Sequence, residues 1–284
     1  MIKGFSRAFL RSNFRALPVR LQFSQENLTQ KSTNNTEEQI KANQAVTKSL
    51  GMNQFLTRVY NTTGLALMGA LGSSYAVMSI PSLAAIMPGL SLFGIVGVLG
   101  GMIGASYMKP INVTETLNGV PIYKTKNTPL RIGLYALGSV SLGLTAAPLF
   151  AYASALSPSI MPTAIGLTTA IFGGSSLAAY NMPKGRMLGF GGALTGALLG
   201  LIGLQVVGLL SAWVMGPNAL SMMLFQADNY LGILLFSGFI AYDTHLAIKM
   251  YEQQNADHVG MSIQFLLDFW NILVRIVSIL SRRD

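Results

Sequence analysis

The sequence predicts an all-α, polytopic membrane protein with about seven transmembrane helices. Apolar residues make up 51% of the 284-residue chain and charged residues only 10%, whereas roughly a quarter of the residues in soluble globular proteins are charged. Apolar runs of about the length that a membrane-spanning helix needs recur along the chain. Proline, glycine or charged residues separate these runs, as expected for connectors between helices.

Composition also excludes several classes of function. Cysteine is absent, which excludes thiol catalysis, disulfides, iron–sulfur clusters and thiolate zinc sites. Because we find no pattern of a hydrolytic triad, a zinc motif or a nucleotide-binding loop, we expect neither an enzyme nor a resident cofactor. The net charge is +9, but five of the nineteen Lys and Arg residues fall in the first twenty positions. The basic balance therefore indicates targeting and membrane topology, and not nucleic-acid binding.

Residues 1–23 predict a mitochondrial presequence. They carry five basic residues and no acidic residue, and Ile2, Phe5 and Phe9 fall on a helix face apart from the first bases. An Arg-rich, acid-free amphipathic segment is typical of transit peptides. The alternative is an amphipathic anchor that stays on the membrane surface. Residues 24–57 follow as a polar arm or linker on the matrix side, with only a weak helical pattern.

We expect residues 58–284 to form a seven-helix membrane domain in contact with the lipid bilayer. Seven apolar runs predict its helices: Val59–Ile80, Leu83–Met108, Leu130–Leu156, Ile160–Met182, Met187–Met215, Leu231–Met250 and Met261–Leu280. The seventh run is the least certain span, since Arg282 and Arg283 follow it.

Glycines recur within these runs at the spacing of helix contacts. Gly97 with Gly101, and Gly192 with Gly196 and Gly200, lie four residues apart. This spacing allows two helix backbones to approach closely. We therefore expect helix packing at both sets of glycines.

Two connectors carry local signals. Asn118-Gly119, between Val, Leu, Ile and Tyr residues, predicts a small β-hairpin within Lys109–Pro129, although Pro121 weakens this prediction. Asp228, in the short connector Gly216–Asn229, is expected to cap the sixth helix and not to bind a ligand.

Charges in the connectors predict the orientation. Eleven Lys and Arg residues after the presequence fall on the N-terminal side, and none falls on the opposite side before Arg282. By the positive-inside rule, the N-terminal side faces the matrix if the membrane is the mitochondrial inner membrane. Arg282 and Arg283 conflict with a seventh crossing, so the last segment either folds back or crosses and tolerates these charges.

The last two runs each contain one acid at the same predicted depth. Asp243 lies eight positions before the connector Tyr251–Gly260 and Asp268 eight positions after it. At ~1.5 Å per residue, both carboxyl groups would lie roughly 12 Å into the apolar layer. A charged side chain costs about 2.5–3.5 kcal/mol at a membrane helix centre, so two at one level indicate a functional role. We expect the pair to share one proton, which a divalent ion would displace on binding.

Around these acids the chain resembles the transmembrane Bax-inhibitor-motif family. Its motif residues are Tyr242-Asp243-Thr244 in the sixth run, and Asp268-Phe269-Trp270-Asn271 with Arg275 in the seventh. With the N-terminus, the best match is the mitochondrial inner-membrane branch of that family. The resemblance implies a central last helix and a paired-aspartate site linked to pH-sensitive calcium leak or calcium/proton exchange. We expect Tyr242, Thr244, Asn271 and Arg275 to support this site, with Thr244 and Asn271 as oxygen donors and Arg275 as a counter-charge.

Two departures from the family pattern leave a second class of function open. Leu83–Tyr107 contains no charged residue, whereas family members with a described pH latch have a basic side chain in the second helix. His245 replaces the common glutamine; we expect it at the membrane interface and His258 in solvent. The alternative to ion transport is therefore a structural role, either as an aspartate lock between helices or as an accessory subunit bound to other subunits of a larger inner-membrane, respiratory-chain assembly.

Overall fold

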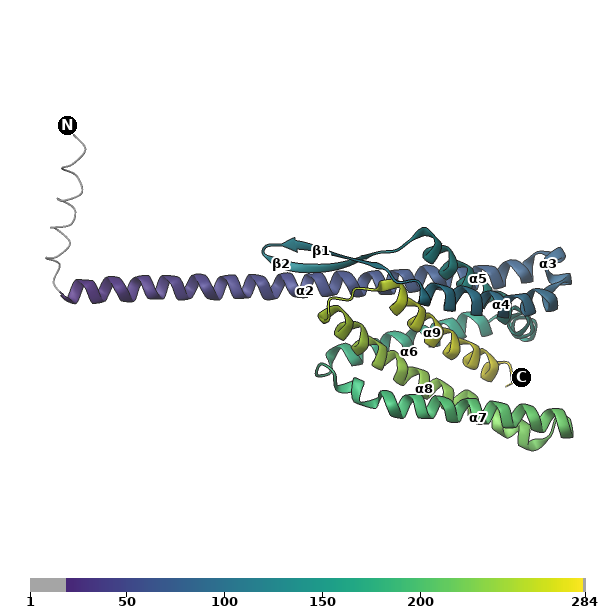
Figure 1. The fold of residues 1–284 in the computed structure, drawn as a ribbon. Helices are drawn as coiled ribbons and strands as arrows, with labels where there is room; N and C mark the ends of the chain where they lie inside the picture. Colours follow the sequence, from purple (N-terminus) through teal and green to yellow (C-terminus); the bar gives the residue numbers. More distant parts are fainter. Residues whose placement is uncertain (1–18, 283–284) are drawn as a thin grey trace. The chain divides into compact units, whose positions relative to one another are not determined.

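The computed structural model describes residues 19–282, and it describes side chains from residue 37 onward (Figure 1). The elements in chain order are α2 (Val19–Ser79), α3 (Pro81–Ala85), α4 (Met87–Tyr107), β1 (Ile111–Leu117), β2 (Val120–Lys126), α5 (Pro129–Leu156), α6 (Ile160–Asn181), η1 (Arg186–Phe190), α7 (Gly191–Met215), α8 (Ala219–Glu252) and α9 (His258–Leu280). Residues 1–18 of the predicted presequence lie outside the described residues, as does Arg283.

The predicted all-α polytopic membrane fold is confirmed. Among residues 19–282, six helices are long and apolar enough to cross a membrane: α4, α5, α6, α7 with its preceding η1, α8 and α9. The first predicted run, Val59–Ile80, lies in α2, which is not one of these six helices of the described chain. Asn61, Thr62 and Thr63 lower the mean hydropathy of that run.

The polar arm forms a continuous helix, although its sequence shows only a weak helical pattern. α2 runs for 61 residues from Val19 to Ser79 and passes through the whole arm. Residues 24–50 contain neither proline nor glycine, so no residue there breaks the helical backbone. The chain divides into two compact units, and all six candidate spans belong to the second, Met52–Glu115 with Tyr123–Asp284.

The predicted β-hairpin is present. β1 and β2 form a two-stranded sheet, and Asn118 and Gly119 connect them with φ angles of 51° and 75°. Positive φ at both central residues is the requirement of a type I′ turn, which asparagine followed by glycine satisfies best. Pro121 is tolerated because each strand of a two-stranded sheet has an unpaired edge.

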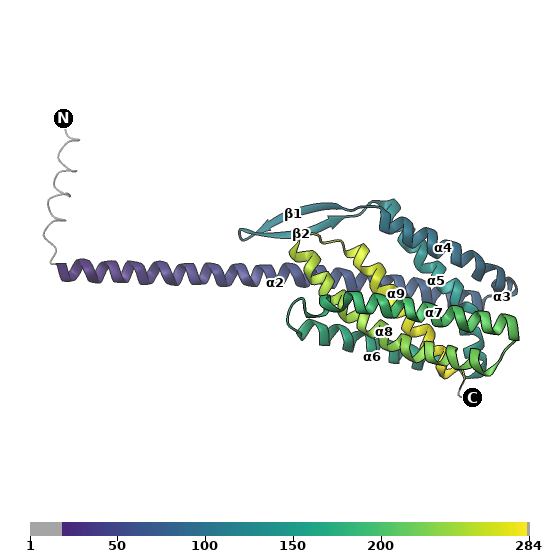
Figure 2. The same cartoon turned by 60° about the horizontal axis from the view of Figure 1, so that its bottom comes forward.

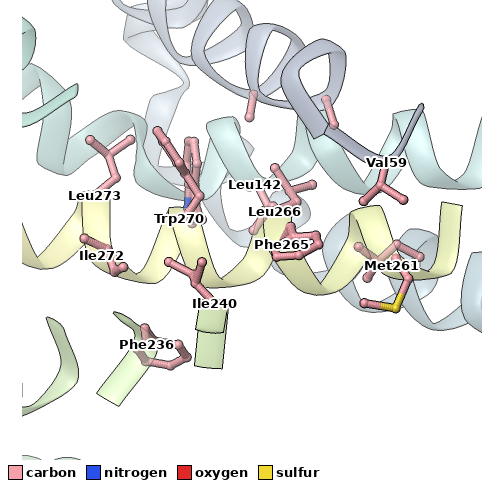
Figure 3. Close-up of a cluster of buried hydrophobic side chains, with 14 of the residues drawn as sticks. Val59, Leu142, Phe236, Ile240, Met261, Phe265, Leu266, Trp270, Ile272 and Leu273 are labelled. Carbon is pink, nitrogen blue, oxygen red and sulfur yellow. The ribbon is translucent and has the colours of Figure 1, made fainter. Parts of the chain in front are cut away.

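α9 lies at the centre of the second unit, as the family resemblance implied. It packs against α4, α5, α6 and α8 (Figures 1 and 2). Figure 3 shows its apolar side chains between Phe236 and Ile240 of α8 and Val59 of α2. Phe265 and Leu266 of α9 are fully buried. The run that looked least certain as a span is therefore the core helix.

One of the two predicted glycine contacts is present. A Cβ atom built at Gly101 of α4 would lie 2.5 Å from the backbone nitrogen of Gly138 in α5, so only glycine permits this approach. The contact predicted at Gly192, Gly196 and Gly200 is wrong within the described chain. A Cβ atom at any of these three α7 positions meets no described atom within 4 Å beyond the helix's own backbone. This face of α7 is therefore open.

α8 begins earlier than predicted, which changes the role of Asp228. The helix starts at Ala219 and not at Leu231, and Asn218 caps it by accepting a 2.8 Å hydrogen bond from the Ser221 backbone N–H. The Ser221 hydroxyl bonds to the Asn218 backbone in return, which completes a capping box. Asp228 is a buried residue inside the helix, and the prediction that it caps the helix is wrong.

Candidate functional site

A cavity of about 560 Å³ lies between α7, α8 and α9. Half of the fourteen residues that line it are leucine, isoleucine or phenylalanine, as expected between membrane helices. Its polar lining comes from Gln205 of α7, Tyr242 and Asp243 of α8, and Gln264, Asp268, Asn271 and Arg275 of α9. Both aspartates that the sequence singled out therefore face one cavity.

The structure brings the carboxyl groups of Asp243 and Asp268 together. Both residues are buried, at 5% and 6% exposure, and both line the same cavity from neighbouring helices, so the two carboxyl groups face one another's surroundings. One oxygen of Asp268, Oδ2, is buried without a hydrogen-bond partner among the described residues. The pair therefore keeps one unused acceptor oxygen within the described residues.

Tyr242 and Thr244 flank Asp243 but differ in their relation to the cavity. Tyr242 lines it, and its ring packs so closely on α7 that a Cβ atom at Gly191 would lie 2.9 Å from Tyr242 Cε2. Thr244 does not line it and donates a 2.8 Å hydrogen bond to the Ile240 carbonyl oxygen. Successive helix residues are about 100° apart, so Thr244 points elsewhere than Asp243. Thr244 therefore does not provide an oxygen ligand for an ion in this cavity, which corrects the expectation from the sequence.

Arg275 pairs with Asp228 and not with the aspartate pair. Its Nη2 lies 3.5 Å from Asp228 Oδ1, and its guanidinium carbon lies 5.0 Å from the centre of the Phe236 ring. Nη1 donates a 2.9 Å hydrogen bond to Asn271 Oδ1. The amide oxygen that we expected to reach an ion is thus already bonded to Arg275. The prediction of Arg275 as direct counter-charge to Asp268 is corrected because seven helix residues separate them by roughly 10.5 Å.

The partners of Arg275 are residues that the sequence motifs did not indicate. Gln205 of α7 donates a 2.9 Å hydrogen bond to Asp228 Oδ1, which links all three helices around the cavity. A Cβ atom built at Gly232 of α8 would lie 1.9 Å from Arg275 Nε, so this glycine makes room for the guanidinium group. Helix periodicity could have placed Asp228 on the cavity side of α8, because residues fifteen positions apart on one helix, such as Asp228 and Asp243, differ by only about 60°. That prediction would have required the knowledge that the helix already begins after Asn218.

A second buried charge pair lies where α9 begins. Arg131 of α5 is 1% exposed, and its Nη1 and Nη2 lie 2.8 and 2.6 Å from Asp257 Oδ1 and Oδ2. Arg131 Nε also donates a 3.0 Å hydrogen bond to the Ala105 carbonyl oxygen of α4. Asp257 caps α9 by accepting a hydrogen bond from the Gly260 backbone N–H at 3.0 Å. This pair joins α4, α5 and α9, and no sequence motif indicated it.

The two histidines have different surroundings. His245 is 2% exposed, and its Nδ1 accepts a 3.0 Å hydrogen bond from the backbone N–H of Gly185 in the connector between α6 and η1. His258 is half-buried: its Nδ1 lies 3.1 Å from Thr125 Oγ1 and its Nε2 lies 3.3 Å from Asn127 Nδ2. Among the described residues, no group of three or more His, Cys, Asp or Glu is placed to hold a metal ion.

Comparison with known proteins gives matches that cover most of the chain. The family model described as inhibitor of apoptosis-promoting Bax1 matches residues 52–284. The probable Bax inhibitor 1 of Paralichthys olivaceus is 30% identical over 231 residues, 81% of this chain and 86% of the relative. Bax inhibitor 1 of Rattus norvegicus is 33% identical over 151 residues, which is 53% of this chain and only 60% of the relative's length. An uncharacterized protein of Caulobacter vibrioides is 30% identical over 216 residues, 75% of this chain and 79% of that protein.

Proposed function

The chain belongs to the Bax-inhibitor family of membrane proteins, and from this premise we propose that it is a pH-sensitive calcium/proton channel or exchanger. Asp243 and Asp268 are the ion-binding residues, and Ca²⁺ and H⁺ are the transported ions. The observation that carries this proposal is the position of two buried carboxyl groups, from neighbouring helices, in the wall of one cavity.

The two ions compete for the same oxygens. With one shared proton the pair carries a single negative charge, and a divalent cation that binds both carboxylates releases that proton into the cavity. Binding is therefore weaker at low pH, when the proton is held, and stronger at high pH. Asp268 Oδ2 has no hydrogen-bond partner among the described residues, so this oxygen is free to bind an entering cation.

The Asp228–Arg275 pair leaves this negative charge uncancelled. Because Arg275 is paired with Asp228, the two charges sum to zero at their end of the cavity. The net charge of the cavity is then that of Asp243 and Asp268. A cation is consequently attracted to the aspartate pair and not to the Arg275 end.

The available oxygens make a weak calcium site, as transport requires. Calcium takes about six to eight oxygen ligands, and two carboxylates supply at most four. Asn271 Oδ1 is engaged by Arg275, and Thr244 does not line the cavity. Water and the Tyr242 and Gln264 side chains, which do line it, would complete the shell.

We further infer that the membrane is the mitochondrial inner membrane, with the connector Lys109–Pro129 on the matrix side. The acid-free, basic residues 1–23 support this location, and the connector charges support the orientation. In these features the chain resembles the growth-hormone-inducible transmembrane protein, the mitochondrial branch of the family.

A structural role is the second candidate. The chain would then be an accessory subunit of a larger inner-membrane, respiratory-chain assembly without transport of its own. The open α7 face at Gly192, Gly196 and Gly200 favours this alternative, because small residues there would admit the helix of another subunit.

Calcium flux from proteoliposomes that contain the purified full chain tests the proposal. We expect flux that rises from the acidic to the alkaline side of neutral pH. Asp243→Asn and Asp268→Asn should each abolish flux and its pH dependence with little loss of thermal stability, since asparagine keeps the shape of aspartate. Glu252→Gln, a change at an exposed acid of the same helix α8, is the matched control and should leave flux unchanged.

Two outcomes would contradict the transport reading. Unchanged, pH-independent flux in both aspartate variants would end the ion-site hypothesis. No flux from the wild-type chain, together with a lower melting temperature in both variants, would favour an aspartate lock in a structural subunit.

A further inference from the structure

A groove of about 440 Å³ lies between α2 and α6, away from the cavity of the proposed function. Its α2 wall belongs to the part of that helix inside the second unit, from Asn53 to Tyr60. Its α6 wall runs from Phe172 to Tyr180. Because α6 is a candidate membrane span, the groove runs along a helix that faces the bilayer.

The groove is polar at one end and aromatic at the other. The Tyr180 hydroxyl donates a 3.3 Å hydrogen bond to Asn53 Oδ1, one residue before α6 ends. Tyr60 and Phe172 make an edge-to-face contact at 6.1 Å between ring centres. Eight residues of α6, roughly 12 Å, separate the two ends. The polar end therefore lies toward the aqueous connector and the aromatic end lies deeper in the membrane.

The floor of the groove is hollow and holds an unsatisfied hydroxyl group. Ser176 is 8% exposed, and its Oγ has no hydrogen-bond partner among the residues that the structure describes. A Cβ atom built at Gly173 meets no described atom within 4 Å, so no side chain fills the space beside it. A buried hydroxyl group without a partner is unfavourable, and a ligand that brings an acceptor oxygen would satisfy it.

Charge distinguishes the kind of ligand. The polar end lies on the side of the protein to which the connectors contribute eleven Lys and Arg residues. Lys184 and Arg186 lie in the connector that follows the end of α6, beyond Tyr180, and both are exposed. Basic residues at this level attract lipids with anionic headgroups. An uncharged lipid would gain nothing from them.

We propose that this groove binds one phospholipid with an anionic headgroup. An ester oxygen accepts a hydrogen bond from Ser176 Oγ, the phosphate lies at the basic connector beyond Tyr180, and an acyl chain runs over Gly173 and along the outer faces of the Tyr60 and Phe172 rings. The proposal is independent of ion transport, since none of these residues lines the α7–α9 cavity.

Photochemical labelling of the purified full chain tests the site. The probes are phosphatidylglycerol and phosphatidylcholine, each with a diazirine in the acyl chain, and mass spectrometry locates the labelled residues. We expect labelling of the α6 groove residues to be several-fold stronger with phosphatidylglycerol. Gly173→Phe should fill the groove and reduce this labelling several-fold. Gly174→Phe is the matched control, because it lies at the same depth, meets no described atom within 4 Å and does not line the groove.

A thermal measurement adds a readout that labelling does not give. Phosphatidylglycerol should raise the melting temperature of the wild-type chain and of Gly174→Phe. It should raise that of Ser176→Ala less, although the alanine variant should be at least as stable without lipid, since it removes an unpaired hydroxyl group.

Equal labelling by both lipids that Gly173→Phe does not change would overturn the proposal, because it would mean non-specific contact with the surrounding bilayer. Cross-links from the groove to another segment of this chain or to a second copy would also overturn it, since a protein segment would then occupy the groove.

Discussion

The buried pair of Arg131 and Asp257 allows the energetic role of one residue to be separated into two parts. Asp257 neutralises a guanidinium group that is 1% exposed, and it also caps α9. Asp257→Ser removes the charge but keeps a side chain that caps helices well. Asp257→Ala removes both. The difference between the two variants therefore measures the cap, and the serine variant alone measures the ion pair.

The structure sets the expected magnitudes. Removal of one partner from a buried ion pair costs about 3–5 kcal/mol because the other charge is left buried and uncompensated. Asp257 keeps 13% of its side-chain surface exposed, so water relieves part of this cost, and we expect about 3 kcal/mol for Asp257→Ser. Loss of the cap adds about 1 kcal/mol. Asp257→Ala should therefore lower the free energy of unfolding by about 4 kcal/mol.

The assay is reversible unfolding of the full chain in detergent micelles, followed by helical circular dichroism. The matched control is Lys184→Ala, which breaks the exposed pair with Glu252, where the side chains are 69% and 35% exposed. Exposed pairs contribute at most about 1 kcal/mol, so the control should lose little stability. The double variant Arg131→Met, Asp257→Leu should recover much of the loss, since it leaves no unpaired charge.

Equal losses for Asp257→Ser and Lys184→Ala would refute the reasoning, because burial would then have no effect on the strength of the pair. The double variant should also lose less stability than Arg131→Met and Asp257→Leu lose together as single variants. A loss equal to their sum would refute the reasoning, since the two residues would then act independently.

Two other predictions concern Gly232 and the N-terminus. Gly232→Ala should lower the free energy of unfolding by about 1–3 kcal/mol, because its Cβ atom would lie 1.9 Å from Arg275 Nε; Gly203→Ala, which meets no described atom within 4 Å, should cause no loss. Equal melting temperatures for these two variants would contradict the predicted clash. Residues 1–30 fused to a fluorescent reporter should direct it to mitochondria, whereas a cytosolic reporter would disprove the targeting prediction. In mitoplasts, added protease should spare Lys109–Pro129, and cleavage there would reverse the proposed orientation.

Local signals predicted their elements well. Asn118-Gly119 predicted the hairpin because only a few residue pairs adopt positive φ at both positions. Asp243 and Asp268 could be matched because equal spacing from a short connector puts two residues of antiparallel helices at one level. These predictions depended on a few neighbouring residues, so tertiary structure had little opportunity to override them.

Predictions failed where the outcome depended on distant residues. The polar arm has weak helical periodicity, yet nothing in its sequence interrupts the helix that continues into α2. Asp228 was predicted to cap α8, but the helix begins at Ala219 with Asn218 as its cap. The residue that pairs with Asp228, Arg275, lies 47 positions away in the chain, so no local pattern reveals it. The glycines at 192, 196 and 200 have the same spacing as a real contact, but spacing does not show which helix, if any, faces them.

The central position of α9 has a consequence for how the chain is assembled. It is the last of the described helices to leave the ribosome, although it packs against α4, α5, α6 and α8. With import led by an N-terminal presequence, the earlier helices also reach the membrane before the helix that fills their shared interior. Until then their inward faces are covered by lipid, by the insertion machinery or by each other. We conclude that native packing is completed after synthesis of the helices, and that nascent chains ending before His258 lack the segment that organises the bundle.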